Sequence, residues 1–290
     1  LRSIEEHGFH LNHVAIIDPA TSPRREEYVK TLFELRQRKG MTLQDADAEL
    51  RDPTVFGALM VHLDEADALV AGVSQHYPET LRPALQIVGK DESISRVAGV
   101  HLVLVNNKTY FFADTTVNID PTAEELADIA ICSADVAREF NVEPRVAMIS
   151  FSNFGSVRHP SAEKVRRATE LVKQLRPDLM IDGEMQADTA VTPEMIDEMY
   201  PFSSLERGAN VLVFPDLQSA NVSFKLLQRL GGAEAIGPIL MGIRKPVHML
   251  QLGSEVKDIV YMTALAVVDA QMKDLEPAPE DVDSPAPVLR

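Results

Sequence analysis

The chain has 290 residues, of which 45% are hydrophobic and 25% are charged, and this balance excludes a fibrous, collagen-like or wholly disordered protein. Its 28 Lys and Arg residues stand against 44 Asp and Glu residues, a net charge of −16, so we expect no general binding to the phosphates of nucleic acid. The sequence contains no apolar run long enough for a membrane span, which would need about 18–20 residues, so we expect no contact with a membrane.

The first third of the chain is predicted to be mainly helical. A short apolar run at 14–19, stopped by Asp18-Pro19, is expected to form the first strand. Apolar residues at helical spacing predict helices over 24–39, 42–50, 54–63 and 80–88, with a strand at 68–72. Gly40 follows the first helix as a typical C-terminal cap.

The rest of the chain alternates strands and helices. Asn106-Asn107 between two β-rich runs, 97–106 and 108–112, predicts a hairpin. Helices are expected over 122–140, 161–175, 219–230 and 254–275, and strands over 145–151, 179–181, 209–214 and 247–250. The last helix is mostly apolar, so we expect it to be buried. The alternation predicts an α/β fold with a largely parallel sheet.

Three places in the sequence suit a phosphorylated ligand, which needs arginines in a cleft or backbone amides at helix N-termini. Arg36 ends the first helix, where a cation also simply suits the helix dipole. Arg82 lies in the first turn of a helix, where it opposes the dipole, and a bound anion would explain it. Ser152 and Asn153 begin a polar strand-to-helix loop that could hold an anion, although many such loops look alike.

Asp258 lies in the first turns of the last helix and has two interpretations. It could stabilise the dipole of a helix that Ser254 caps. It could also act as a general base toward a thiol, whose reference pKa is about 8.5. The sequence leaves both interpretations open.

The sequence carries no sign of export. The single cysteine, Cys132, cannot form an intrachain disulfide, fits a reducing compartment and is interpreted as a small core residue. Residues 1–6 are acidic and lack the apolar segment of a signal peptide. We therefore predict a cytoplasmic location. The chain opens with Leu1 rather than methionine, so we expect a fragment of a longer polypeptide.

Several long segments resemble one protein family. Residues 182–190 resemble the DGExQxDxA signature of phosphotransacetylases, which are also called phosphate acetyltransferases. Residues 209–221 resemble the ANVLIFPDL segment of that family and the asparagine that follows it. Further matches in the same order lie at 80–84, 232–239, 245–247 and 258–260. Because the matches cover nearly the whole chain, it is identified as a member of this family.

The resemblance implies a two-domain α/β fold with an interdomain cleft, similar to isocitrate and isopropylmalate dehydrogenases. It places residues 1–92 and 247–275 in the first domain and residues 93–246 in the second, through which the family dimerises. Residues 276–290, acidic and rich in proline, are expected to form a disordered tail. The implied reaction moves an acetyl group between acetyl phosphate and coenzyme A, with no metal and no organic cofactor.

The resemblance also implies roles for individual residues. Arg36 and Arg82 match two arginines around the phosphate, and Asp258 matches the base that deprotonates the thiol of coenzyme A. Gln251 and Leu252 stand where active members have serine and arginine, and Gln251 is still expected to contact the ligand. Since a charge-assisted hydrogen bond is worth about 1.5–3 kcal/mol, the missing arginine predicts little or no acetyl transfer.

A subset of the family leads to the main functional prediction. Residues 150–156, 158–160, 188–190 and 246–251 resemble the C-terminal domain of hybrid bacterial malic enzymes. We therefore expect a regulatory domain that binds acetyl-CoA as an inhibitory ligand and follows a malic-enzyme domain in the same chain. NADP and a divalent metal are expected only in that upstream part. The alternatives are an active phosphate acetyltransferase and a purely structural oligomerisation domain.

Overall fold

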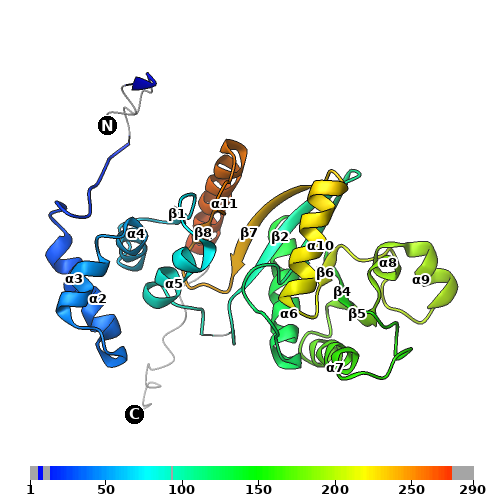
Figure 1. The fold of residues 1–290 in the computed structure, drawn as a ribbon. Coiled ribbons are helices and arrows are strands. Elements are labelled where there is room, and N and C mark those ends of the chain that lie inside the picture. Colours follow the sequence, from blue (N-terminus) through cyan, green and yellow to red (C-terminus); the bar gives the residue numbers. More distant parts are fainter. Residues whose placement is uncertain (1–5, 9–13, 93, 276–290) are drawn as a thin grey trace, which may run out of the picture.

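The computed structural model describes residues 6–8, 14–92 and 94–275, so the predicted tail at 276–290 lies outside the described residues. Figure 1 shows a helical N-terminal part, a small two-stranded sheet beside the long last helix, and a larger six-stranded sheet covered by helices. The α/β class is thereby confirmed.

The N-terminal part is a cluster of helices. It contains α2 (Arg25–Arg36), the 3-10 helix η1 (Gln37–Lys39), α3 (Leu43–Glu49), α4 (Pro53–His62) and α5 (Tyr77–Ile87). Gly40 ends η1 in the left-handed conformation, with φ 90°, and Thr42 and Asp45 cap α3 by reciprocal hydrogen bonds. Buried apolar side chains, including Tyr28 and Leu59, join these helices in one core. The predicted helices of this part are confirmed.

The first predicted strand is wrong. Residues 14–18 form neither helix nor strand, and Val14 and Ile17 are exposed by 57% and 46%. An isolated apolar run needs a neighbouring strand to satisfy its backbone, and this run pairs with none of the described strands.

A small parallel sheet brings distant segments side by side. β1 (Leu69–Ala71) pairs with β8 (Val247–Met249). The last helix, α11 (Val256–Leu275), contacts β1, β8 and β7 (Glu234–Met241). Among the described helices, none combines the length and the apolar character that crossing a lipid bilayer requires.

The expected burial of the last helix is wrong. Met262 and Ala266 are buried, but Val256 and Val260 expose 77% and 58% of their surface. Apolar residues occupy several sides of α11, whereas the sheets cover one side, so apolar surface remains exposed on the others.

The larger sheet has the strand order β5-β4-β6-β3-β2-β7. Its other strands are β2 (Ala98–Val105), β3 (Lys108–Ala113), β4 (Arg145–Ile149), β5 (Met180–Met185) and β6 (Val211–Val213). β3, β6, β4 and β5 run parallel, whereas β2 is antiparallel to both β3 and β7. The sheet is therefore mixed rather than largely parallel. Asn106 and Asn107 form the predicted hairpin turn, with φ values of 49° and 58°.

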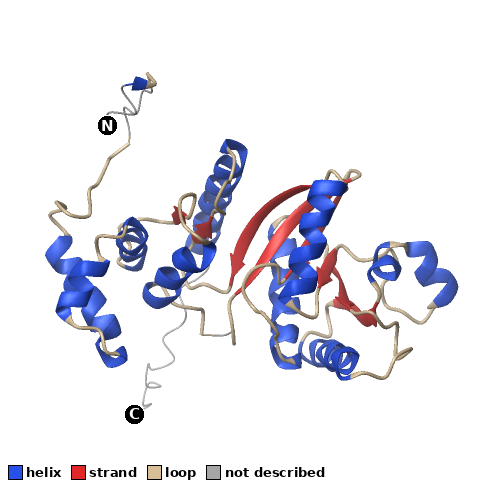
Figure 2. Cartoon of the chain, viewed as in Figure 1, coloured by secondary structure: helices blue, strands red, loops and turns tan. Residues whose placement is uncertain are grey.

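Helices cover both faces of this sheet (Figure 2). One face packs against α6 (Ala123–Glu139) and α7 (Pro160–Leu175), and the other against α8 (Ala187–Val191), α9 (Pro193–Met199) and α10 (Leu217–Leu230). Side chains alternate between the two cores as the period of a strand requires: Val146 and Met148 of β4 face the first, whereas Ala147 and Ile149 face the second. This rigid sheet holds the loops that build the site.

Candidate functional site

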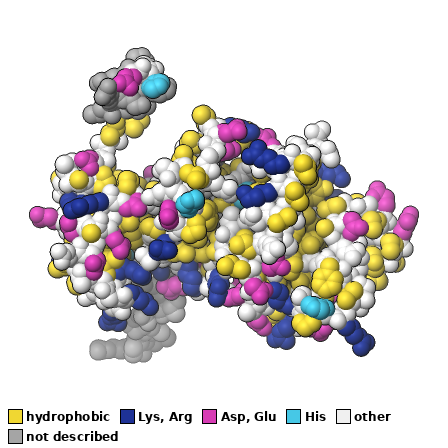
Figure 3. Space-filling model, viewed as in Figure 1, with side chains coloured by type: hydrophobic (Ala, Val, Ile, Leu, Met, Phe, Trp, Pro, Cys, Tyr) yellow, Lys and Arg dark blue, Asp and Glu magenta, His cyan; other side chains and the backbone are white. Residues whose placement is uncertain are grey.

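A cavity of about 670 Å³ lies where the N-terminal ends of α5 and α10 meet the loop that follows β8. Pro78 of α5 lies on one side, Gln218 of α10 on another, and Gln251 and Leu252 of the loop complete the wall. Figure 3 shows hydrophobic side chains at the surface along α10 and in the middle of the molecular face that the figure displays. Of the residues proposed from the sequence, the structure brings Gln251 and Leu252 together in this cavity.

One face of α10 lines the cavity. Gln218, Asn221 and Lys225 follow at intervals of three and four residues, so they share that face. Asp216 caps the helix by accepting a hydrogen bond from the Ser219 amide at 2.7 Å. Among the described residues, no aspartate or glutamate lines the cavity, and Lys225 brings a positive charge into it.

The segment after β3 forms another wall. The buried carboxylate of Asp114 accepts hydrogen bonds from four backbone amides, three of them in residues 116–118. This arrangement fixes the turn that carries Thr116 and Ile119 into the cavity wall. The wall is therefore held by backbone contacts that leave the Thr116 hydroxyl free.

Two buried hydroxyl groups of this cavity make no hydrogen bond. The oxygens of Tyr77 and Thr116 are inaccessible to solvent and lie near each other, but their geometry is not that of a hydrogen bond, and neither forms one with another described residue. Burial raises the pKa of the Tyr77 hydroxyl, so it remains a proton donor at neutral pH. Buried polar atoms are rarely left without partners, so these two groups mark a place for a ligand or for water.

A second, smaller cavity of about 260 Å³ contains Arg36. Its Nε atom is buried and has no hydrogen-bond partner, and Gln86 of α5 lies in the same cavity. Pro78, Arg82 and Gln86 recur every four residues on α5, so one helix face leads from the larger cavity past Arg82 to the smaller one. The distance along the axis is about 12 Å. Arg82 is exposed and lines neither cavity.

Asp258 lies in the first turn of α11. Its Oδ2 atom accepts a hydrogen bond from the Glu255 amide at 2.7 Å, and the Ser254 hydroxyl accepts one from the Gln251 amide at 3.0 Å. The Asp258 contact is that of a capped helix start, whereas the Ser254 contact closes the turn before the helix, so the predicted cap by Ser254 is wrong. Asp258 is half-buried and is not among the residues that line the cavity.

Ser152 and Asn153 belong to a loop whose polar groups are paired within the protein. Buried Glu184 accepts hydrogen bonds from the Ser152 hydroxyl (2.9 Å), the Gly155 amide (2.8 Å) and the Arg166 guanidinium (3.0 Å). Burial raises the pKa of Glu184, but the hydrogen bonds from Arg166 and Gly155 outweigh it and hold that pKa below its ordinary value. The side chain of Asn153 pairs with Gln186.

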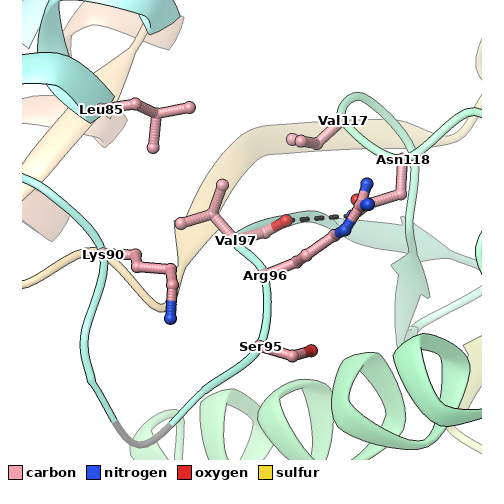
Figure 4. A pocket seen from close by; sticks show the side chains of 7 residues that line it. All are labelled: Leu85, Lys90, Ser95, Arg96, Val97, Val117 and Asn118. Atoms are coloured by element: carbon pink, nitrogen blue, oxygen red, sulfur yellow. Dashed lines mark hydrogen bonds between the residues drawn. The ribbon is translucent and has the colours of Figure 1, made fainter. Parts of the chain in front are cut away.

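A third cavity, of about 350 Å³, lies near the start of β2 (Figure 4). Its two cations have protein partners: Lys90 donates to the Ile94 carbonyl, and Arg96 forms an ion pair with Glu125. Asn118 donates to the Val97 carbonyl at 2.9 Å. In the described residues, His, Cys, Asp and Glu side chains form no group that could hold a metal ion.

The protein family described as "Phosphate acetyl/butaryl transferase" matches residues 2–267. The chain therefore belongs to this family, as the motifs had indicated. It is 42% identical to a phosphate acetyltransferase of Clostridium acetobutylicum over 90% of this chain and 80% of that protein. A phosphotransacetylase structure from Streptococcus pyogenes superposes with a TM-score of 0.87 at 42% identity, covering 94% of this chain and 83% of that one.

Other relatives are much longer than the matched region. The chain is 41% identical to an NADP-dependent malic enzyme of Escherichia coli over 90% of this chain, but it spans 34% of that protein. It likewise spans 36% of the phosphate acetyltransferase of Salmonella typhimurium, with 44% identity. The likeness to the malic enzyme thus lies in a shared portion of that protein.

The predicted inactive regulatory domain with an upstream malic-enzyme domain is wrong. The relatives of which the chain covers 80% and 83%, at 42% and 43% identity, are phosphate acetyltransferases. The prediction depended on the charge missing at Leu252, but the same cavity contains Lys225. Lys225, Tyr77 and Thr116 were not predicted from the sequence, although Lys225 lies one turn after Asn221, the last residue of a segment that resembles the family.

Proposed function

We propose that the chain is an active phosphate acetyltransferase, which converts acetyl phosphate and coenzyme A to acetyl-CoA and phosphate, and the reverse. The observation that carries this proposal is 42% identity over 80% of the Clostridium acetobutylicum enzyme. The cavity between α5 and α10 supports it, because it combines a cation, unpaired donors and an apolar wall. An acetyl phosphate molecule offers matching groups, an anionic phosphoryl group and a methyl group.

The face of α5 provides a path for coenzyme A, which is long and carries several phosphates. Arg82 lies on this face, and Arg36 lies at its far end with a buried nitrogen that lacks a partner. We propose that these two arginines bind phosphates of coenzyme A while its thiol reaches the larger cavity. Guanidinium groups suit this role because they donate several hydrogen bonds in one plane.

The chemistry requires a base and a donor. We propose that Asp258 takes the proton of the coenzyme A thiol, and that the thiolate attacks the acetyl carbonyl carbon. A carbon–sulfur bond forms, the bond between that carbon and the bridging oxygen breaks, and phosphate leaves with the electron pair. The side-chain amide of Gln251 lies in the cavity and can donate to the oxyanion. We propose that no metal or organic cofactor takes part, and that Ser152 and Asn153 act by shaping the loop rather than by binding substrate.

We also propose how this site is assembled in the whole protein. The molecule has a first domain of residues 1–92 and 247–275 and a second domain of residues 93–246, arranged as in isocitrate and isopropylmalate dehydrogenases. The division is supported by a core centred on the N-terminal helices and β8, which also includes Val97, Leu240 and Ile243, and by two cores on the larger sheet. The cavity then belongs to the cleft between them. We propose a dimer formed through the second domain, in the cytoplasm.

The test is the formation of acetyl-CoA by the purified chain from acetyl phosphate and coenzyme A, followed by the absorbance of the thioester. We expect turnover in the ordinary range of about 1–1000 per second. We expect Asp258→Asn to lower kcat by about 100-fold or more, as the loss of a general base does. A wild-type chain that forms no thioester at millimolar substrates would refute the proposal.

A further inference from the structure

We propose that Lys225 is the cation that binds the phosphoryl group of acetyl phosphate and the phosphate released from it. The inference rests on the proposed function, and it assigns the phosphate end of that site to α10. Leu252 brings no charge to this cavity, and Lys225 is the one lysine or arginine among the described residues that line it.

The surroundings of Lys225 leave its charge available. Its Nζ atom lies 5.1 Å from the centre of the Phe224 ring, and it forms no ion pair in the described part of the chain. The cavity it lines contains no carboxylate. In the third cavity, by contrast, both Lys90 and Arg96 have protein partners. An anion entering the larger cavity thus meets a positive charge that no described acidic group neutralises.

The other groups around Lys225 also favour an anion. The first turns of α5 and α10, at Tyr77 and Leu217, both line the cavity, and backbone amides at helix starts attract negative charge. The buried hydroxyls of Tyr77 and Thr116 lack partners and can donate to phosphoryl oxygens. Leu252 and Ile119 supply apolar surface in the same cavity, which suits the acetyl methyl group.

Binding of inorganic phosphate tests this assignment without any need for turnover. Calorimetry should show that Lys225→Met weakens phosphate binding by about 10- to 100-fold, the usual effect of removing one charge-assisted hydrogen bond. Lys225→Arg should retain most of the affinity. Lys30→Met, which changes an exposed lysine on α2, should bind as the wild type does. Equal binding by wild type and Lys225→Met, or no binding by wild type, would overturn the assignment.

Kinetics separate this inference from the proposed function. Lys225→Met should raise the KM for acetyl phosphate by about 10- to 100-fold while the KM for coenzyme A changes little, because the latter depends on Arg36 and Arg82. A larger rise in the KM for coenzyme A than in that for acetyl phosphate would contradict the assignment. If wild type binds phosphate through Lys225 but forms no thioester, the proposed function fails and the phosphate site stands.

Discussion

Two polar regions of this protein differ in how their hydrogen-bonding groups are paired. Ser152 and the Gly155 amide in the loop after β4, and Arg166 of α7, all donate hydrogen bonds to Glu184 of β5. In the cavity between α5 and α10, the hydroxyls of Tyr77 and Thr116 have no hydrogen-bond partner. The first region is complete in the protein alone, whereas the second has donors left for a ligand.

The difference shows how to separate structural motifs from binding sites. A buried polar group with all its partners in the protein contributes to stability, and its loss leaves those partners unsatisfied. A buried group without a partner carries an uncompensated desolvation cost until a ligand or water arrives. Substitutions in the loop should therefore lower stability, and substitutions in the cavity should lower affinity.

The largest expected effect is on stability, at Glu184. Glu184→Ala leaves Arg166 and the Gly155 amide without their acceptor, so we expect the free energy of unfolding to fall by roughly 3 kcal/mol. This is the lower end of the range for a broken buried ion pair, because Arg166 is partly exposed. Urea unfolding measures the loss. Glu124→Ala removes an exposed pair with Arg167 and should change little. Equal effects of the two substitutions would contradict the comparison.

The stabilising effect of Glu184 should also depend on pH. Its pKa is lower in the folded protein than in the unfolded chain. Its contribution is therefore complete above the unfolded value of about 4.3, and it is lost as the pH falls through the folded value. Glu184→Gln should remove this part of the acid sensitivity, as unfolding experiments from pH 7 to pH 3 would show. An unchanged acid profile would contradict the assigned charge.

The next effect is on affinity, at Arg82. We expect Arg82→Gln to raise the KM for coenzyme A by about 10- to 100-fold through loss of a charge-assisted phosphate contact. The stability should barely change, because the side chain is exposed. Arg51→Gln is the control, since Arg51 is also exposed and lines neither cavity. The KM for coenzyme A is measured from initial rates at varied coenzyme A concentration. An unchanged KM in Arg82→Gln would show that Arg82 does not bind coenzyme A.

A matched pair of hydroxyl deletions sharpens the comparison. Ser152→Ala removes a donor to Glu184 and an acceptor of the Val157 amide, so we expect a loss of about 1–2 kcal/mol. Thr116→Val removes a buried hydroxyl that has no hydrogen-bond partner, so we expect the unfolding free energy to stay unchanged or to rise slightly. Thermal unfolding of both variants measures this. A larger loss in Thr116→Val than in Ser152→Ala would break the distinction.

The smallest expected effect is a gain at Leu252. Leu252→Arg places a second cation in the cavity beside Lys225. Position 252 is exposed, so the added charge should strengthen binding of acetyl phosphate by only about 0.5–1 kcal/mol and lower its KM by a few-fold. The same substitution should partly rescue Lys225→Met. Initial rates at varied acetyl phosphate concentration check both expectations. A substitution that lowers only the KM for coenzyme A would contradict them.

Local patterns in the sequence were sufficient for most of the fold. The capped helices and the Asn106-Asn107 hairpin depend on neighbouring residues, so their spacing predicts them. β7 was missed because Gly237-Pro238 interrupts its apolar run. Proline is tolerated there because β7 is an edge strand that pairs with β2 alone, and the register of that pair shifts between Val100 and Leu102.

The cavity could not be predicted in the same way. Its walls come from four segments, 76–78, 116–119, 217–225 and 251–252, and only the tertiary fold brings them together. The family motifs indicated segment 251–252, and the prediction of an inactive domain relied too heavily on the leucine at position 252. When one position in a site lacks a charge, a residue on another helix or strand can supply a charge to the same site. Spacing along the chain does not reveal such a residue.

The central claim is that this chain transfers acetyl groups at the cavity between α5 and α10. Initial rates of acetyl-CoA formation, measured against acetyl phosphate concentration for wild type and Lys225→Met, test it most directly. We predict wild-type turnover within about 1–1000 per second and a rise of about 10- to 100-fold in the KM for acetyl phosphate in the variant. No thioester from the wild type, or the same KM in both proteins, would contradict the claim.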